Sequence, residues 1–271
     1  MRSCVGGILA SGFLLFTGSL SQEAEAVPAP APANLRLPAP EARQGAASDG
    51  IYVYAIDNDR IGKYRITTGE RVAQWRGDRQ LFPHMNSCTV VGRELVCAAS
   101  NYPAVPQTSA VEFFDRATLR HLRTVSLGIG PGSLTAMDRH AGKWWAVFAN
   151  YAGKGGEPGR DHRYTLLVRM DNDFRQEAAW TFPPEVLARF APYSCSGASW
   201  SKDGRLFVAG HDLPEIYELE LPTAGSQLEL RRTIAIATPG QAIDWDPARP
   251  GRLWSIDRAK GEMVASELPH N

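Results

Sequence analysis

Several features that would assign this sequence to a common functional class are absent. Lys plus Arg and Asp plus Glu both number 29, so the net charge is zero and nothing favours nucleic acid or an anionic membrane surface. No Gly-x-Ser-x-Gly nucleophile elbow is present, and no glycine-rich loop ends in Gly-Lys-Ser/Thr. The sequence therefore offers no motif for a serine hydrolase or for a phosphate-binding loop.

Long helical patterns are also scarce. From residue 50 onward, apolar and polar residues alternate and β-branched residues are frequent, which is typical of strands. Pro184–Phe190 is the single segment with a helical pattern, and it predicts one or two turns. The sequence therefore predicts an all-β domain.

The N-terminus has the pattern of an export signal. Arg2 supplies a positive charge, Val5–Leu20 is apolar or small, and Ala24-Glu25-Ala26 fits a cleavage site. The apolar run is shorter than the roughly 20 residues that span a bilayer, although an uncleaved anchor is the alternative. We predict a signal peptide over residues 1–26, a periplasmic or secreted protein, and no membrane association after signal removal.

Residues 27–49 are rich in Pro and Ala, which predicts an extended linker before a domain over residues 50–271. One segment within this linker has a second interpretation. Leu35-Arg36-Leu37 could add an outer strand to the last structural repeat and so close a ring of repeats.

The domain contains an internal repeat of roughly 40–50 residues, the spacing of four-stranded propeller blades. Each copy has a strand, a tight turn, a second strand and a polar pair, followed by one or two further strands. The copies begin with Ser87–Tyr102, Leu134–Tyr151, Gly197–Asp212 and Ala242–Arg258, and a fifth, Gly50–Asp57, has a weaker first strand. We predict a five-bladed β-propeller, with a six-bladed ring as the alternative.

Two of the four cysteines are predicted to form a disulfide. If Gly92-Arg93 is a two-residue turn, Cys88 and Cys97 lie opposite each other as a non-hydrogen-bonded pair, with Cα atoms about 4.5 Å apart. Export to an oxidising compartment favours the bond over two buried thiols. Cys195 is then left unpaired and is expected to be a packed thiol.

Polar residues are expected to meet at one mouth of the central channel. In each hairpin the first strand starts beside the end of the second, and equivalent ends should gather on one face of a ring. Convergent polar groups in a concave place are a default site hypothesis, although Asn and Asp also cap turns. The predicted ligand-binding residues are His84, Asn86, Asn101, Tyr102, Ser133, Asn150, Tyr151, Ser196, Asp212, Gln241 and Asp257.

His211 is the candidate acid–base residue, because histidine titrates near neutrality and Asp212 follows it. Asn and Asp oxygens would suit a divalent ion such as calcium, although no close metal-ligand motif is present. Residues 153–159 are glycine-rich and predict a flexible lid or surface loop, with Lys154 as a possible contact.

Several stretches resemble a family of exported bacterial propellers labelled cycloisomerase-like. They include His84-Met-Asn-Ser-Cys-Thr-Val-Val, Cys97-Ala-Ala-Ser-Asn-Tyr-Pro, Gly210-His-Asp-Leu-Pro-Glu-Ile-Tyr and Gly240-Gln-Ala-Ile-Asp-Trp-Asp. The resemblance implies the fold and export, and supplies no catalytic residues. The chain is more distantly similar to gluconolactonase-type propellers, which hold a central divalent ion with acidic and Asn ligands. The resemblance implies that Asn101, Asn150 and Asp257 would occupy ligand positions here, while the early Glu ligand of that family has no counterpart.

The first functional hypothesis is an exported propeller that binds a small polar molecule at the channel mouth and catalyses lactone hydrolysis or a ring-opening isomerisation. The alternatives are a non-catalytic interaction scaffold and a carbohydrate-binding propeller, in which Tyr102 and Tyr151 would stack on sugars. The sequence does not identify a protein partner.

Overall fold

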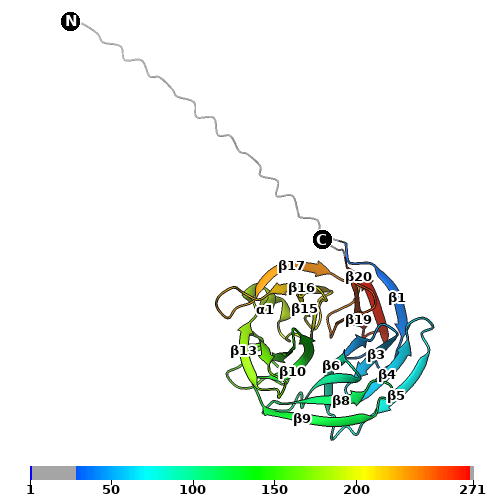
Figure 1. Ribbon diagram of the computed structural model, residues 1–271. Coiled ribbons are helices and arrows are strands. Elements are labelled where there is room, and N and C mark those ends of the chain that lie inside the picture. The colour runs from blue at the N-terminus through cyan, green and yellow to red at the C-terminus, as the bar shows by residue number, and fades with distance from the viewer. Residues whose placement is uncertain (2–28, 269–271) are drawn as a thin grey trace.

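Five four-stranded antiparallel sheets are arranged around a central axis (Figure 1), which confirms the five-bladed β-propeller. The computed structural model describes Met1 and residues 29–268, so the predicted signal peptide lies outside the described residues apart from its first residue. Among these residues, no helix has both the length and the apolar character needed to cross a membrane. Export and localisation therefore stay predictions.

The blades follow one another along the chain. Blade 1 contains β2 (Gly45–Ser48), β3 (Tyr52–Asp57), β4 (Arg60–Arg65) and β5 (Arg71–Arg76). Blade 2 contains β6 (His84–Val91), β7 (Glu94–Ser100), β8 (Thr108–Asp115) and β9 (His121–Ile129). Blade 3 contains β10 (Ser133–His140), β11 (Lys143–Ala149), β12 (Leu166–Met170) and β13 (Gln176–Thr181).

Blade 4 contains β14 (Gly197–Trp200), β15 (Leu206–Ala209), β16 (Glu215–Glu220) and β17 (Glu229–Ala235). Blade 5 contains β18 (Asp244–Trp245), β19 (Arg252–Asp257), β20 (Glu262–Glu267) and, from the other end of the chain, β1 (Ala33–Pro38). The first strands of neighbouring blades contact one another all the way round, from β2 through β6, β10, β14 and β18 back to β2. These five strands therefore surround the channel.

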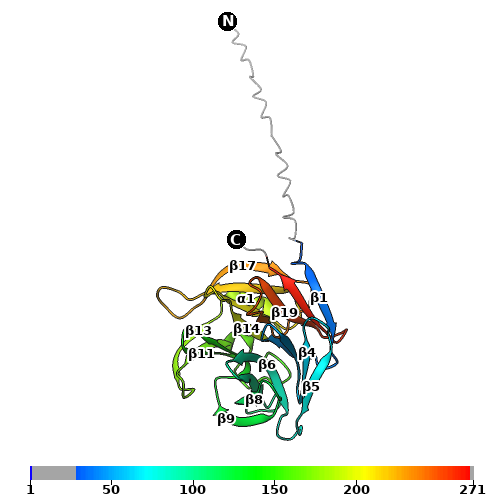
Figure 2. The ribbon, with the colours of Figure 1, turned by 45° about the vertical axis from the view of Figure 1, so that its right-hand side comes forward.

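The ring is closed by the N-terminal strand β1, which lies along β20 in both views (Figures 1 and 2). Leu37 of β1 pairs with Met263 of β20, so the closing strand foreseen at Leu35-Arg36-Leu37 is present. β2 also lies within the segment that composition assigns to a linker. Its residues Ala46 and Ala47 are buried, and such small side chains leave little hydrophobic pattern for sequence analysis to detect. The propeller therefore begins before residue 50.

The core consists of five hydrophobic clusters, one between each pair of neighbouring blades. Side chains alternate between the two faces of a strand, so each strand serves two clusters. In β7, Leu95 and Cys97 pack toward blade 1, whereas Val96 and Ala98 pack toward blade 3. Because both faces of a blade are covered, the second strands are continuous apolar runs.

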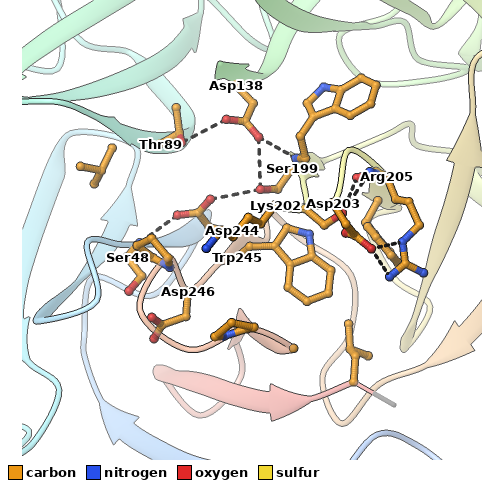
Figure 3. A pocket seen from close by; sticks show the side chains of 18 of the residues that line it. Ser48, Thr89, Asp138, Ser199, Lys202, Asp203, Arg205, Asp244, Trp245 and Asp246 are labelled. Carbon is orange, nitrogen blue, oxygen red and sulfur yellow. Dashed lines mark hydrogen bonds and ion pairs between the residues drawn. The ribbon is translucent and has the colours of Figure 1, made fainter. Parts of the chain in front are cut away.

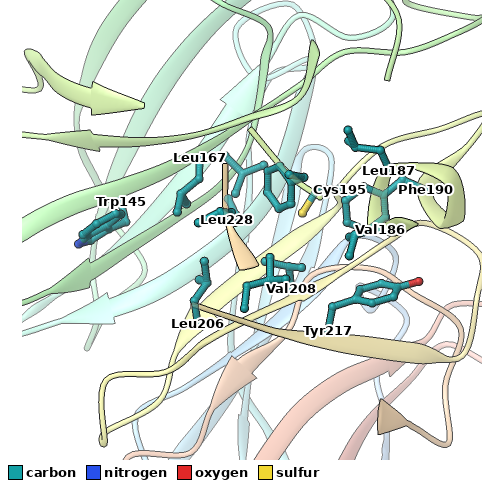
Figure 4. Close-up of a cluster of buried hydrophobic side chains, with 14 residues drawn as sticks. Trp145, Leu167, Val186, Leu187, Phe190, Cys195, Leu206, Val208, Tyr217 and Leu228 are labelled. Atoms are coloured by element: carbon teal, nitrogen blue, oxygen red, sulfur yellow. The ribbon is translucent and has the colours of Figure 1, made fainter. Parts of the chain in front are cut away.

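The cluster between blades 3 and 4 also includes the one α-helix of the described residues, α1 (Pro184–Phe190), as the sequence predicted (Figure 4). Phe190 packs edge-on against Tyr217, with ring centroids 5.6 Å apart. The unpaired Cys195 lies in the same cluster and is 1% exposed. Burial raises the pKa of this thiol to about 12, so it is a packed and unreactive group, as predicted.

The predicted disulfide Cys88–Cys97 is confirmed, with a Cα–Cα distance of 4.0 Å. The hairpin register is also the predicted one, because Val91 pairs with Glu94 and Cys88 pairs with Cys97. Gly92 has a φ of 60°, a left-handed conformation that glycine adopts without a Cβ penalty. The turn chemistry therefore fixes the register that brings the two sulfur atoms together.

Candidate functional site

All five first strands start at one end of the channel and finish at the other. The channel therefore has two mouths, and their chemistry differs. We call the end at which they start the arginine mouth, defined by His84, Tyr102, Tyr151, His211 and Arg258. We call the end at which they finish the carboxylate mouth, defined by Ser48, Thr89, Asp138, Ser199 and Asp244. The residues predicted from sequence belong to the side of the arginine mouth.

Aromatic rings from different blades meet at the arginine mouth. The ring centroids of His84 and Tyr102 are 5.1 Å apart, and those of Tyr102 and Tyr151 are 5.0 Å apart. The guanidinium of Arg258 lies 3.4 Å from Nε2 of His211. The ring thus brings residues of blades 2, 3, 4 and 5 together, as the geometric argument from sequence required.

Burial and positive charge keep His84 of this mouth neutral. Burial, followed by the charge of Arg258, lowers the pKa of His84 to about 4. Burial, followed by the charge of Arg43, also lowers the pKa of Arg258. Burial raises the pKa of Tyr102 as well. At neutral pH the mouth therefore presents a neutral imidazole, protonated phenols and a guanidinium.

The Asn and Asp residues at the strand ends mostly serve their own loops. Asn101 accepts a main-chain N–H of its loop at 2.9 Å, and the amide of Asn150 donates to two main-chain carbonyls at 2.8 and 3.1 Å. Asp257 forms ion pairs with Lys260 at 3.1 Å and with Arg36 of the outermost strand at 3.6 Å. Asn101 and Asp257, which the lactonase resemblance suggested as ligands of an ion, are engaged in separate contacts. The side-chain oxygen of Asn150, the third such residue, is buried and has no hydrogen-bond partner within residues 29–268.

Three of the other predicted residues are also engaged in contacts of their own. Asn86 donates to a main-chain carbonyl of blade 3 at 2.7 Å, and Gln241 donates to the carbonyl of His211 at 3.3 Å. Asp212 contacts Nδ1 of His211 at 2.5 Å. The two remaining predicted ligand-binding residues are serines: Ser133 is buried and Ser196 is half-buried. Within the described residues no group of three or more His, Cys, Asp or Glu side chains is arranged to hold a metal ion.

The glycine-rich loop at residues 153–159 is held against blade 2. Gln107 donates from its side chain to the carbonyl of Gly155 at 2.7 Å, and its main-chain N–H donates to Glu157 at 2.6 Å. A Cβ on Gly155 would lie 2.5 Å from the ring of Tyr102, so only glycine allows the loop to approach so closely. The loop is therefore a fixed wall beside Tyr102.

A pocket of about 810 Å³ opens at the carboxylate mouth (Figure 3). Figure 3 shows Asp138, Ser199 and Asp244 following one another across it, with Thr89 and Ser48 at the two ends. Each of these five residues comes from a different first strand or its immediate end. The pocket is therefore built by the fivefold repeat itself.

Hydrogen bonds connect these five residues into one chain. The Thr89 hydroxyl donates to Asp138 at 3.4 Å, and the Ser199 hydroxyl lies 3.3 Å from Asp138 and 3.1 Å from Asp244. The main-chain N–H of Ser48 donates to the other oxygen of Asp244 at 2.9 Å. One polar chain thus spans all five blades across the channel.

Proton counting shows that this chain cannot contain two ionised carboxylates with every contact satisfied. The Ser199 hydroxyl has one proton but lies between two carboxylate oxygens. Asp138 accepts two main-chain N–H groups, from Arg139 at 2.6 Å and Trp200 at 2.7 Å, which favour its ionised form. A protonated Asp244 that donates to Ser199, with Ser199 donating to Asp138, satisfies the whole chain.

The pKa directions agree with this proton count. Burial raises the pKa of Asp138 to about 6. Burial, followed by the charge of Asp138, raises the pKa of Asp244 well above its usual value. Asp244 is 6% exposed, whereas Asp138 keeps more exposure toward the pocket. Carboxyl groups with strongly shifted pKa values in a concave place are typical of functional sites.

Aromatic and charged residues form the wall and rim of the pocket. Trp200 stacks on His140 with centroids 4.2 Å apart, and Trp245 packs edge-on against Phe207 at 4.9 Å. Arg205 lies 3.1 Å from Glu218 in an ion pair, and Lys202 also lines the pocket (Figure 3). The pocket therefore combines apolar surface with both hydrogen-bond donors and acceptors.

Sequence analysis did not identify the residues of this mouth. A signal was present, because each first strand carries one Ser, Thr or Asp at the equivalent position near its end: Ser48, Thr89, Asp138, Ser199 and Asp244. The residues predicted from sequence lie at the opposite ends of the same blades' strands. Aligning the five first strands residue by residue would have shown the repeated polar position.

Comparisons with known proteins support the fold alone. No protein-family model and no curated protein sequence matches the chain. Among solved structures, hydrazine synthase of Kuenenia stuttgartiensis has a TM-score of 0.50 at 9% identity, covering 83% of each chain. A PQQ-bound aldose sugar dehydrogenase of Streptomyces coelicolor has a TM-score of 0.50 at 12% identity, covering 88% of this chain and 96% of that one. The cycloisomerase-like resemblance gains no support beyond the propeller fold.

Proposed function

We propose that this propeller binds a small polar molecule in the carboxylate mouth and catalyses hydrolysis of a cyclic ester there. The single observation that carries the proposal is the pair of carboxyls, Asp138 and Asp244, joined through one hydroxyl at the pocket floor. Two carboxyls in different protonation states supply a base and an acid in one site. This moves the proposed catalytic role from His211 to the opposite end of the channel.

One ionised and one protonated carboxyl can together provide the proton transfers that hydrolysis of a lactone needs. The ionised Asp138 takes a proton from a water molecule as that water attacks the ester carbonyl carbon. The carbonyl carbon–ring oxygen bond then breaks, and the protonated Asp244 gives its proton to the departing oxygen. Ser199 connects the two carboxyls, so a proton can return from Asp138 to Asp244 and restore the starting state. The product is an open-chain hydroxy acid.

The alternative proposal is carbohydrate binding without catalysis. Two indoles, Trp200 and Trp245, line the same pocket beside carboxylate acceptors and basic donors. Aromatic faces and charged hydrogen-bonding groups together suit a polyhydroxylated ring. This alternative predicts binding of sugars that are left chemically unchanged.

Export to the periplasm or medium is part of the proposal, and the Cys88–Cys97 disulfide supports it. No divalent ion is required by the proposed reaction, because the two carboxyls supply the proton transfers. A calcium-dependent reaction stays a separate prediction from the resemblance to lactonases.

The test is a pH-stat assay with a panel of five- and six-membered lactones, compared with calorimetry of non-hydrolysable sugars. Asp138→Asn should lower turnover by about 100-fold or more, because it removes the base. Asp244→Asn should retain binding and lose turnover, because its amide imitates a protonated carboxyl without a transferable proton. Asp173→Asn, an exposed carboxyl outside the pocket, is the matched control.

Lactone turnover by Asp138→Asn and Asp244→Asn at the wild-type rate would contradict the proposal. Binding of sugars with no turnover of any lactone would favour the carbohydrate-binding alternative. Absence of both would leave the interaction scaffold as the better description of the fold's use.

A further inference from the structure

The arginine mouth contains a guanidinium without a carboxylate partner. Within residues 29–268, Arg258 forms no ion pair, and its side chain contacts Nε2 of His211 at 3.4 Å. Its surroundings are partly buried, and burial is the main cause of its lowered pKa. A partly buried cation is ordinarily paired, so its environment is incomplete as it stands.

The nearby carboxylates are committed elsewhere. Asp57 forms an ion pair with Arg60, and Asp257 pairs with Lys260 and Arg36 on the outer side of blade 5. Asp212 contacts the other ring nitrogen of His211, Nδ1. None of them lies within ion-pair distance of Arg258.

A second cation adds to the positive potential of this mouth. The Arg43 guanidinium donates to the main-chain carbonyl of Arg258 at 3.1 Å, and Arg43 also has no ion-pair partner among the described residues. Two neighbouring guanidiniums repel each other unless an anion lies between or beside them. The arrangement thus favours occupation by a negatively charged group.

The surrounding rings supply further donors and apolar surface. The ring centroids of Tyr102 and His84 lie 5.1 Å apart, and Tyr193 stacks on His211 with centroids 4.1 Å apart. His84 is neutral at pH 7, so its imidazole adds a hydrogen-bonding edge and no second charge. Phenol and imidazole edges can donate to an oxygen, while their faces suit a flat apolar body.

We propose that the arginine mouth is a binding site for a small organic carboxylate, held by the Arg258 fork with Arg43 as the supporting charge and the aromatic rings against its carbon body. A planar carboxylate matches a guanidinium with two parallel hydrogen bonds. The aromatic surroundings favour an organic acid over an inorganic oxyanion. This site is separate from the carboxylate mouth and does not depend on the catalytic proposal.

The test is isothermal titration calorimetry of the wild-type protein with benzoate, acetate and inorganic phosphate at constant ionic strength. Saturable one-to-one binding of benzoate, tighter than acetate or phosphate, is expected. Arg258→Gln should weaken benzoate binding by about tenfold or more, because a charged bidentate contact is lost. Arg258→Lys should weaken it less, because the charge remains but the fork does not.

Two control variants distinguish a specific effect of Arg258 from a general loss of positive charge and from an effect of the carboxylate mouth. Arg120→Gln, which removes an exposed arginine of blade 2, should leave benzoate binding unchanged. Asp138→Asn should also leave it unchanged, so failure of the catalytic proposal would not affect this result. Should Arg258→Gln fail to fold, Arg258→Lys and Arg43→Gln carry the same comparison.

Equal benzoate binding by wild type and the Arg258 variants would overturn the proposal. So would the absence of saturable binding by all three anions. Binding of phosphate in preference to both carboxylates would overturn the assignment to organic acids.

Discussion

The two mouths of the channel are built from the same five strands but have opposite electrostatics. The carboxylate mouth gathers Asp138 and Asp244, whose pKa values burial raises. The arginine mouth gathers Arg258 and a neutral His84, whose pKa values burial lowers. In each mouth burial holds one group in its uncharged form, Asp244 in one and His84 in the other.

The contrast between the two mouths follows from the repeated architecture. Equivalent positions of the five blades supply a ring of side chains, and the identity of each side chain decides the chemistry of that ring. Ser, Thr and Asp at the strand finishes produce a connected hydrogen-bond chain. Loop residues at the strand starts produce an aromatic cluster around a guanidinium.

The largest expected effect concerns His84. Its folded pKa of about 4 lies below the unfolded value of about 6.5, so the unfolded chain binds the proton first. Its contribution to stability is complete above the unfolded pKa and is lost as the pH falls through the folded value. Relative to His84→Gln, the wild type should lose up to about 3 kcal/mol between pH 6.5 and 4.

Urea unfolding of both proteins at several pH values measures this difference. Parallel stability curves for wild type and His84→Gln over that range would show that His84 titrates normally.

Asp138 should produce a slope of the opposite sign. Its folded pKa of about 6 lies above the unfolded value of about 3.9, so the folded protein holds the proton more tightly. The contribution is complete below the unfolded pKa and is lost as the pH rises through the folded value. Relative to Asp138→Asn, the wild type should lose up to about 3 kcal/mol between pH 4 and 6.5.

The same urea series checks this prediction, with Asp173→Asn as the control for a general effect of removing an acid. A wild-type curve that rises relative to Asp138→Asn over this range would reverse the assigned sign.

Asp244→Asn should have the smallest effect. A protonated Asp244 donates to Ser199 and accepts the N–H of Ser48, and an asparagine amide can do both. Stability at pH 7 should therefore change by about 1 kcal/mol or less. A much larger loss in a thermal or urea denaturation experiment would indicate that Asp244 is ionised in the folded protein.

Much of the fold could be predicted from sequence because its determinants are local and repeated. The turn at Gly92-Arg93 fixed the pairing of Cys88 with Cys97, and the apolar second strands marked the blades. β2 was harder to find, because its short run of small residues has almost no hydrophobic contrast. Its burial comes from neighbouring blades, which the local sequence does not reveal.

The site was predictable only in part. Tyr102, Tyr151 and His211 lie on one side of the ring, as the strand ends predicted, but the neighbouring Asn101 and Asn150 bond to nearby loops. Asp138 and Asp244 gain their properties from burial and from each other across the channel. Such coupling between distant segments appears only when the ring is closed.

The most direct test of the central claim is carbon-13 NMR titration of the aspartate carboxyls, with Asp138 and Asp244 assigned by their Asn variants. We predict that the Asp138 carboxyl titrates near pH 6 and that Asp244 remains protonated well above the ordinary aspartate pKa of about 3.9. Titration of both carboxyls near that ordinary value would contradict the shared-proton site, and with it the proposed acid–base chemistry of the carboxylate mouth.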